Sequence, residues 1–167
     1  YYLINEAGGI GHFLPDYEKM IRLGIRGYLD SIKGQDGDLC RAAEIACEGL
    51  ADFARRLADE AARLAETEKD SVRAEELRRI ADVCRRVPVS PAETFHEALQ
   101  ALWFTHMTVC LEGLNSAVSF GRIDQYLYPY YQKDISQGRI TPEQAFDLLL
   151  SFSAKTTCLL YTSPSPR

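Results

Sequence analysis

Apolar residues recur three and four positions apart along most of the chain, a spacing that places them on one face of an α-helix. The pattern predicts helices over residues 16–32, 38–68 and 71–86. In the second of these helices the expected apolar stripe comprises Leu39, Ala43, Ala46, Leu50, Phe53, Leu57 and Leu64. In the third it comprises Leu77, Ile80, Ala81 and Cys84.

Capping patterns predict where several helices begin. Asp38 is the expected N-cap of the long second helix. The segments at 90–93 (SPAE) and 141–144 (TPEQ) each place a hydroxyl cap before a proline, with an acid or amide three residues later. Residues 95–109 are apolar on nearly all sides, which indicates a buried helix. Strand-like segments are few, the best being residues 1–4, so we expect a mostly α fold.

Composition narrows the possible partners. The chain has 167 residues, 46% of them apolar and 26% charged, as in an ordinary soluble globular protein. A net charge of -5 and a pI near 5.2 argue against a nucleic-acid or anionic-membrane surface. No apolar run approaches the ~18 residues of a membrane helix, and the first residues lack the features of a signal peptide. We therefore expect a cytoplasmic protein with no nucleic-acid or membrane partner.

The residues that commonly bind metals and nucleotides do not form the usual motifs. Five cysteines are scattered without a C-x-x-C pair, so neither a disulfide framework nor a zinc site is indicated. His96 and His106 are ten residues apart on one predicted helix, where packing is the default interpretation and no metal site is expected. The loop Gly8-Gly9-Ile10-Gly11 suggests dinucleotide binding, but Leu14 stands where a third glycine is required.

Three segments together resemble one enzyme family. The run at 119–131 reads SFGRIDQYLYPYY, and residues 11–19 (GHFLPDYEK) and 91–100 (PAETFHEALQ) precede it in family order. They resemble the glycyl radical enzymes, which include pyruvate formate-lyase and the diol dehydratases. The resemblance covers roughly residues 5–155 and implies a piece of the N-terminal half, a helical part of their ten-stranded α/β barrel. Residues 1–157 would then be a partial pyruvate formate-lyase-like domain, whereas residues 158–167 resemble sequencing-adapter read-through.

The resemblance also implies substrate contacts. His12 would lie in a loop after a barrel strand, where pyruvate-cleaving members have an arginine. Because histidine lacks the guanidinium fork that binds a carboxylate, pyruvate is disfavoured. Asn115 and Ser116 would lie in a second substrate-facing segment that offers fewer hydroxyl-binding groups than in glycerol dehydratases, which disfavours glycerol. For all three residues, capping or turn formation is an equally good interpretation.

The run at 119–131 is itself expected to be structural. Its members are Gly121, Arg122, Asp124, Gln125, Tyr128 and Pro129. Arg122 and Asp124 cannot share a helical face, so we expect them to contact different partners. A buried arginine would hold the barrel wall, and the residues packed around it would be Tyr126, Tyr128, Pro129 and Tyr130. Substrate contact is the alternative. Cys110-Leu111-Glu112 resembles the family's catalytic Gly-Cys-x-Glu loop, but Val109 replaces the glycine, and we interpret Cys110 as a packed apolar residue.

The resemblance implies a radical lyase of the formate acetyltransferase type, anaerobic and homodimeric, that breaks a carbon–carbon or carbon–heteroatom bond in a small organic substrate. A radical SAM activating enzyme would install the glycyl radical. The catalytic cysteine and radical glycine loops do not occur in the chain, so we expect no catalytic residue or bound cofactor here and an inactive isolated chain. The alternative is a non-enzymatic helical module whose charged faces over residues 38–86 bind a partner protein.

Overall fold

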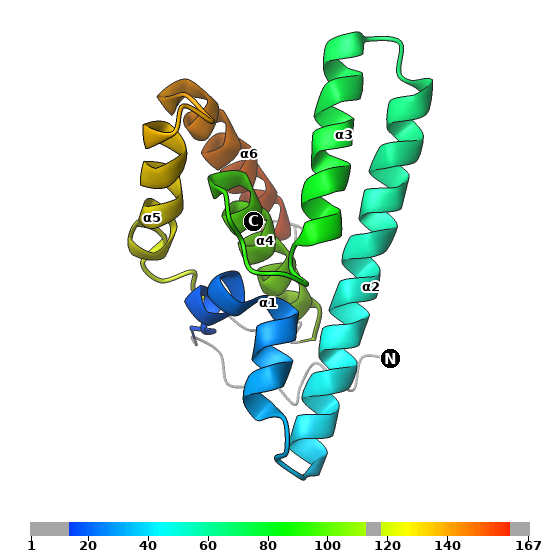
Figure 1. Ribbon diagram of the computed structural model, residues 1–167, viewed down its shortest axis with the longest axis vertical. Helices are drawn as coiled ribbons and strands as arrows, with labels where there is room; N and C mark the ends of the chain where they lie inside the picture. The colour runs from blue at the N-terminus through cyan, green and yellow to red at the C-terminus, as the bar shows by residue number, and fades with distance from the viewer. Residues whose placement is uncertain (1–13, 113–117, 161–167) are drawn as a thin grey trace, which may run out of the picture.

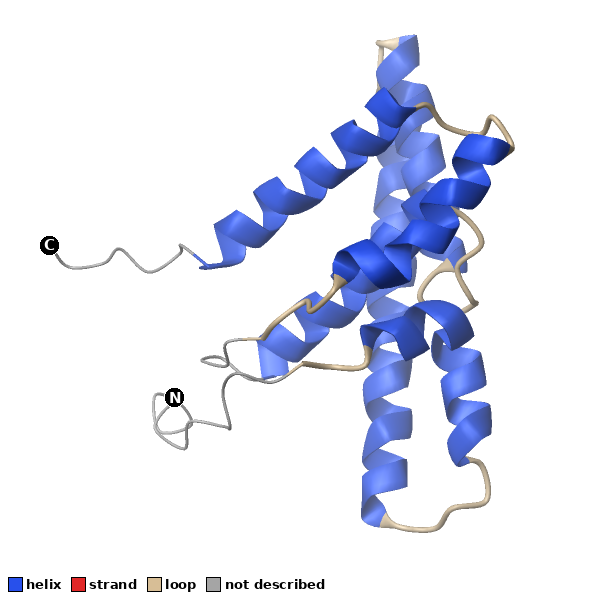
Figure 2. Cartoon of the chain, turned by 90° about the vertical axis from the view of Figure 1, so that its left-hand side faces the viewer, coloured by secondary structure: helices blue, strands red, loops and turns tan. Residues whose placement is uncertain are grey.

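The structure is a computed structural model that describes residues 14–112 and 118–160. Within these residues the backbone forms helices and loops and no β-strand, as the colours of Figure 2 show. This confirms the mostly α fold; the expected strand at 1–4 lies outside the described residues. The helices are α1 (Tyr17–Ile32), α2 (Asp38–Thr67), α3 (Ser71–Arg86), α4 (Phe95–Glu112), α5 (Ile123–Ser136) and α6 (Pro142–Leu160).

Helices α2 and α3 form a long antiparallel hairpin (Figure 1). Their contact is lined by small side chains that allow the two backbones to approach closely: Ala54, Ala58, Ala61 and Ala65 on α2, and Ala74 and Ala81 on α3. Helix α3 has the predicted bounds. Its N-cap is Asp70, whose carboxylate accepts a hydrogen bond from the amide of Val72 at 2.9 Å.

The predicted apolar stripe of α2 is wrong in part. Leu39, Leu57 and Leu64 are 84%, 41% and 40% exposed, and Ala46 is exposed as well, whereas Leu50 is buried as expected. The face that meets α3 is centred on the alanines instead, because close packing of two helices selects small residues and leaves the leucines on its flank. The predicted cap is also shifted by one residue: Gly37 is the N-cap, and Asp38 is the first helical residue.

Helix α1 is kinked at Gly24, which has φ 65° and ψ 176°. Residues 88–92 cross the helix at the kink and replace its missing hydrogen bonds. The amides of Ile25 and Arg26 donate to the carbonyls of Pro88 at 2.8 Å and Val89 at 3.1 Å. A Cβ atom at Gly24 would lie 2.5 Å from the carbonyl carbon of Ser90. Only glycine therefore fits this position, both for its φ and for the approaching backbone.

Helix α4 lies at the centre of the fold and packs against α1, α2, α3, α5 and α6. Ala98, Leu102 and Phe104 on this helix are fully buried. Most of the apolar residues of α4 belong to a cluster shared with α1, α3, α5 and α6, whereas Phe104 belongs to a second cluster shared with α1, α2 and α3. The prediction of a buried helix over residues 95–109 is confirmed.

The predicted start of α4 at Ser90-Pro91 is wrong. The helix begins at Phe95, because the backbone of residues 88–92 is hydrogen-bonded to α1 instead. The capping box lies four residues later: Thr94 Oγ1 accepts from the amide of Glu97 at 3.2 Å, and the carboxylate of Glu97 accepts from the amides of Thr94 and Glu93. The second predicted box is confirmed, with Thr141 and Gln144 capping α6 reciprocally at 2.9 and 3.2 Å.

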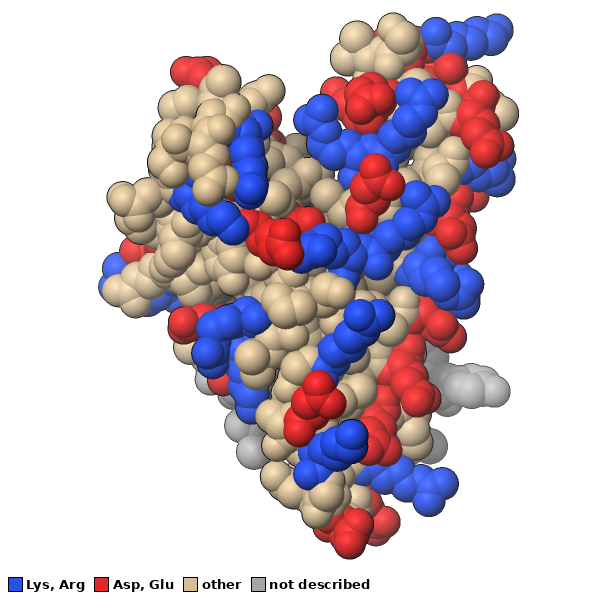
Figure 3. Space-filling view, viewed as in Figure 1, with Lys and Arg blue, Asp and Glu red and all other residues tan. Residues whose placement is uncertain are grey.

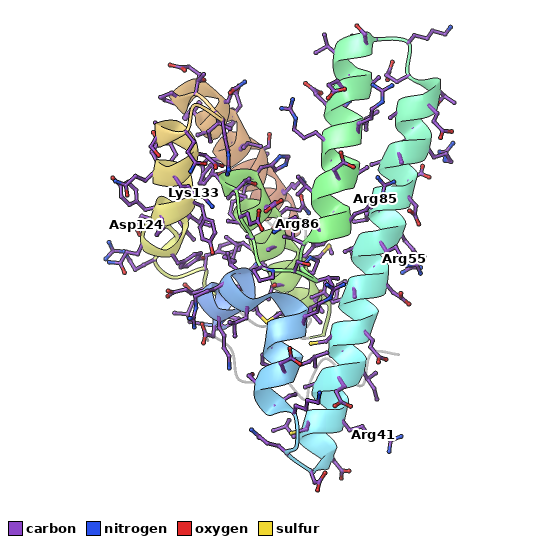
Figure 4. All side chains as sticks on the ribbon, viewed as in Figure 1. Arg41, Arg55, Arg85, Arg86, Asp124 and Lys133 are labelled. Carbon is purple, nitrogen blue, oxygen red and sulfur yellow. The ribbon has the colours of Figure 1, made fainter. Side chains whose placement is uncertain are left out.

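A second carboxylate also stabilises the start of α4. Asp134 on α5 is 1% exposed and accepts from the amide of Phe95 at 2.7 Å and from Arg139 at 3.2 Å. Lys133 on α5 donates to the carbonyl of Glu93, and Arg86 on α3 lies 3.1 Å from a carboxylate oxygen of Glu97. Figure 4 shows these two cations on either side of α4. The amino end of α4 is thus bound to α3 and α5 through charged groups.

The surface of the α2–α3 hairpin carries both signs of charge intermixed (Figure 3). Apart from those of Arg86, its ion pairs among the described residues join residues three or four apart on the same helix, for example Arg63 with Glu60 at 2.6 Å and Arg73 with Glu76 at 2.7 Å. Across residues 14–112 and 118–160, no helix combines the length and apolar character needed to cross a membrane.

Candidate functional site

Four side chains from distant parts of the chain meet beside the carboxyl end of α4. We call Tyr17, His106, Cys110 and Phe120 the His106 cluster. The hydroxyl of Tyr17 lies 2.7 Å from His106 Nδ1, and Cys110 Sγ lies 3.5 Å from His106 Nε2. The ring of Phe120 stacks on His106 with centroids 4.0 Å apart and lies 5.9 Å from the ring of Tyr17. The cluster therefore joins α1, α4 and the segment before α5.

Burial keeps the titratable members of the His106 cluster uncharged. It lowers the pKa of His106 and raises the pKa of Cys110. The pKa of Tyr17 is raised well above its usual value, mainly by burial and further by the negative charges that Cys110 and Tyr126 would carry. A neutral imidazole has one donor and one acceptor nitrogen, so His106 can hydrogen-bond Tyr17 and Cys110 at once in either tautomer.

The cluster lies at the described ends of both candidate substrate segments. Tyr17 opens α1, five residues after His12. Cys110 is in the last turn of α4 and Phe120 lies just beyond residues 113–117, which include Asn115 and Ser116. His12, Asn115 and Ser116 are themselves outside the described residues, so their substrate contacts stay predictions. The chain segments that flank them nevertheless converge.

Gly121 adds a second contact between the same two segments. It has φ 65°, and a Cβ atom there would lie 2.9 Å from Cδ1 of Leu14. The residue before it, Phe120, is fixed by its carbonyl, which accepts a hydrogen bond from the hydroxyl of Tyr126 at 2.9 Å. Gly121 therefore allows the segment before α1 to lie against the segment before α5.

The expectation for Arg122 and Asp124 is wrong in two respects. The side chains bind each other through two hydrogen bonds of 2.9 and 2.6 Å, and both are exposed, at 69% and 62%. Arg122 is the N-cap residue of α5 and lies outside its regular helix, so the argument from helical faces does not apply. The hydrogen bond from Arg122 lowers the pKa of Asp124. Figure 4 shows Asp124 at the outer edge of the molecule.

Residues 123–131 of the run lie in α5, with Pro129 inside the helix. The amide of Gln125 donates to the carbonyl of Arg122 at 2.9 Å, which closes the first turn. Tyr128 is 55% exposed and Pro129 is exposed, contrary to the expected packing, whereas Leu127 is buried. Exposed and buried residues alternate along α5 because one face of the helix packs on α4 and the other faces outward.

The other candidates behave as ordinary helix residues. Cys110 is half-buried inside α4, so it lies in a regular helix and not in a loop. His96 is half-buried on the same helix, where burial, then the charges of Arg79 and Lys155, lower its pKa. Among residues 14–112 and 118–160, no three histidine, cysteine or acidic side chains gather closely enough to hold a metal ion.

Residues 3–164 match the family described as pyruvate formate lyase-like. The chain belongs to this family. Isethionate sulfite-lyase of Oleidesulfovibrio alaskensis is 38% identical to this pyruvate formate lyase-like chain over 166 aligned positions, which cover 89% of the chain and 20% of the relative. The chain therefore spans about a fifth of that relative's length.

Two solved structures confirm the resemblance to glycyl radical enzymes. A glycyl radical enzyme from Archaeoglobus fulgidus has a TM-score of 0.76 and 38% identity, over 84% of the chain and 20% of that protein. A Roseburia inulinivorans protein, described for 1,2-propanediol dehydration, has a TM-score of 0.77 and 35% identity, over 84% of the chain and 19% of that protein. The six helices of this pyruvate formate lyase-like chain thus correspond to a helical part of such enzymes.

Proposed function

We propose that this chain is part of a glycyl radical lyase that breaks a carbon–heteroatom or carbon–carbon bond in a small organic substrate. The observation that carries the proposal is the convergence of the segments next to His12 and next to Asn115 and Ser116 at the His106 cluster. The relatives' names describe a sulfite-lyase and a diol dehydration. Both reactions remove a small group from a small organic molecule, which supports a carbon–heteroatom bond as the first choice.

In this proposal His12, Asn115 and Ser116 hold the substrate by hydrogen bonds. Histidine can donate to or accept from a hydroxyl, and an amide and a hydroxyl offer both roles as well. The complete protein would carry a glycyl radical, installed by a radical SAM activating enzyme, that supplies the hydrogen-abstraction chemistry. We further propose that this protein is a cytoplasmic homodimer, and that the 167-residue chain has no turnover because it spans only about a fifth of its relatives.

The signature on α5 has a structural role in this proposal. Gly121 permits the contact with Leu14, and the side chains of Arg122 and Asp124 bind each other at the start of α5. Tyr128 and Pro129 would pack against parts of the enzyme beyond this chain. The boundary at residue 157 stays a prediction: α6 continues to Leu160, and the family match runs to residue 164.

The test begins with the source DNA, read in both directions beyond the codons of this chain. We expect the frame to continue into a Gly-Cys-x-Glu loop and a radical glycine loop. The complete protein, activated without oxygen by a radical SAM enzyme, should show the doublet EPR signal of a glycyl radical. A stop codon directly after Arg167 would contradict the proposal, as would an activated protein with no such signal.

Substrate contact is tested in the same complete protein. Isethionate and 1,2-propanediol are the first compounds to assay. Replacing His12 with Ala should raise KM about two- to tenfold, because a lost hydrogen bond to a bound polar group costs roughly 0.5–1.5 kcal/mol. The matched control is His96→Ala on α4, which should leave KM unchanged. Equal KM values for the two variants would remove His12 from the site.

A further inference from the structure

His106 contacts three separate parts of the chain with one side chain. It is only 6% exposed, and both of its ring nitrogens have a partner. Nδ1 lies 2.7 Å from the hydroxyl of Tyr17 on α1, and the ring stacks on Phe120 at 4.0 Å. Trp103, one turn earlier on α4, lies 6.5 Å from the ring. A buried polar side chain with this many partners specifies one arrangement of the elements around it.

The two hydrogen bonds of His106 differ in what they join. The bond to Cys110 links residues four apart on α4, so it adds little to the tertiary structure. The bond to Tyr17 joins residues 89 positions apart and fixes the start of α1 against the end of α4. The Tyr17 bond is also shorter, and an O–H···N bond is stronger than one to a thiol.

We propose that His106 is a positioning residue: through Tyr17 and Phe120 it fixes the start of α1 against the residues just before α5. This inference rests on the proposed function, because His12 lies five residues before Tyr17 in sequence and Ser116 lies four residues before Phe120. His106 itself would not touch the substrate. Its contribution is to hold two hydrogen-bonding groups at the separation that one small molecule requires.

Two amide variants separate the hydrogen bonds of His106. The side-chain amide of His106→Asn can occupy the place of Nδ1 and keep the bond to Tyr17, whereas that of His106→Gln can occupy the place of Nε2 and keep only the contact with Cys110. Both variants lose the ring stacked on Phe120, so they are matched in packing. Tyr17→Phe removes the same bond from the other side, and Tyr130→Phe, on α5, is the control for that change.

The first measurement is hydrogen–deuterium exchange on the 167-residue chain. We expect His106→Gln and Tyr17→Phe to raise exchange about two- to tenfold in peptides from residues 17–23 and 118–126, since a typical net hydrogen bond has this effect on a local equilibrium. Peptides from the α2–α3 hairpin should not change. At residues 17–23, His106→Asn and Tyr130→Phe should stay closer to wild type, because the Asn variant keeps the bond to Tyr17. Equal exchange of residues 17–23 in the Asn and Gln variants would overturn the proposal.

The second measurement is steady-state kinetics of the complete protein with isethionate or 1,2-propanediol. A positioning role predicts that His106→Gln raises KM several-fold more than His106→Asn does. Loss of folded protein alone would lower kcat at constant KM, and that result would overturn the positioning role. If the complete protein turns over neither compound and shows no glycyl radical signal, the proposed function fails and the positioning role with it. The exchange result would then still establish or exclude the hydrogen bond between His106 and Tyr17.

Discussion

Replacing Gly24 with alanine should destabilise the protein more than any other glycine-to-alanine change in the described helices. The residue has φ 65° and ψ 176°, a region that costs a residue with a Cβ atom about 1–3 kcal/mol. The new methyl group would also lie 2.5 Å from the carbonyl carbon of Ser90 and 2.8 Å from the carbonyl oxygen of Val89. Relieving this main-chain overlap costs about 1–3 kcal/mol more.

The expected loss is therefore about 2–6 kcal/mol in the free energy of unfolding, a large part of the total for a domain of ordinary stability. Urea denaturation followed by far-UV circular dichroism measures it. The control is Gly49→Ala in the middle of α2, where a Cβ atom would meet nothing within 4 Å. That change should stabilise the protein by about 0.5–1 kcal/mol through helix propensity. A Gly24→Ala protein within about 0.5 kcal/mol of wild type would refute the account of the kink.

Three further predictions concern the buried groups Asp134, His106 and Cys84. Asp134→Ala should lower the free energy of unfolding by about 3 kcal/mol, because the buried amide of Phe95 loses its acceptor; a loss no greater than at an exposed aspartate in thermal melts would contradict this. The folded protein lowers the pKa of His106 below 6.5, so the unfolded chain binds more protons and stability should fall as the pH drops from about 7 to about 5. His106→Gln should flatten that dependence, and an unchanged slope in urea titrations would argue against it. Burial raises the pKa of Cys84 to about 11, so iodoacetamide at about pH 8 should label Cys40 well before Cys84 in mass spectra. Similar labelling rates would indicate that Cys84 is accessible.

The sequence predicted the parts of this fold that depend on neighbouring residues. The bounds of α3 and the Thr141–Gln144 capping box follow from signals within a few positions of each other. The burial of α4 follows in the same way, from a helix that is apolar all round. Such features are independent of how the helices are later arranged.

Features that depend on distant segments were missed. The helix predicted over residues 16–32 runs through Gly24 without a kink, because nothing near this residue in sequence shows that residues 88–92 will cross there. The shifted start of α4 has the same cause. In α2 the leucines and the alanines are both plausible core faces, and the position of α3 decides between them.

The candidate site shows the same limit. The loops with His12, Asn115 and Ser116 were chosen by resemblance, and their contacts still need an experiment. His106 was interpreted as a packing residue, and it is buried, but its bond to Tyr17 has no signal in the sequence. A histidine and a tyrosine 89 residues apart show their connection only once α1 and α4 are placed together.

The crossing of α1 by residues 88–92 also has a consequence for the order of folding. The α2–α3 hairpin lies between the two crossing segments in sequence. Its two helices are joined by a short loop, so the hairpin can form early. Its closure brings residues 88–92 back toward α1 and removes most of the loop entropy of that contact. Changes in the alanine contact of the hairpin should therefore slow folding, whereas changes at the crossing should mainly speed unfolding. Stopped-flow measurements on Ala58 and Gly24 variants would distinguish the two effects. In this chain, the hairpin, which contributes no residue to the His106 cluster, would set the rate at which that cluster is assembled.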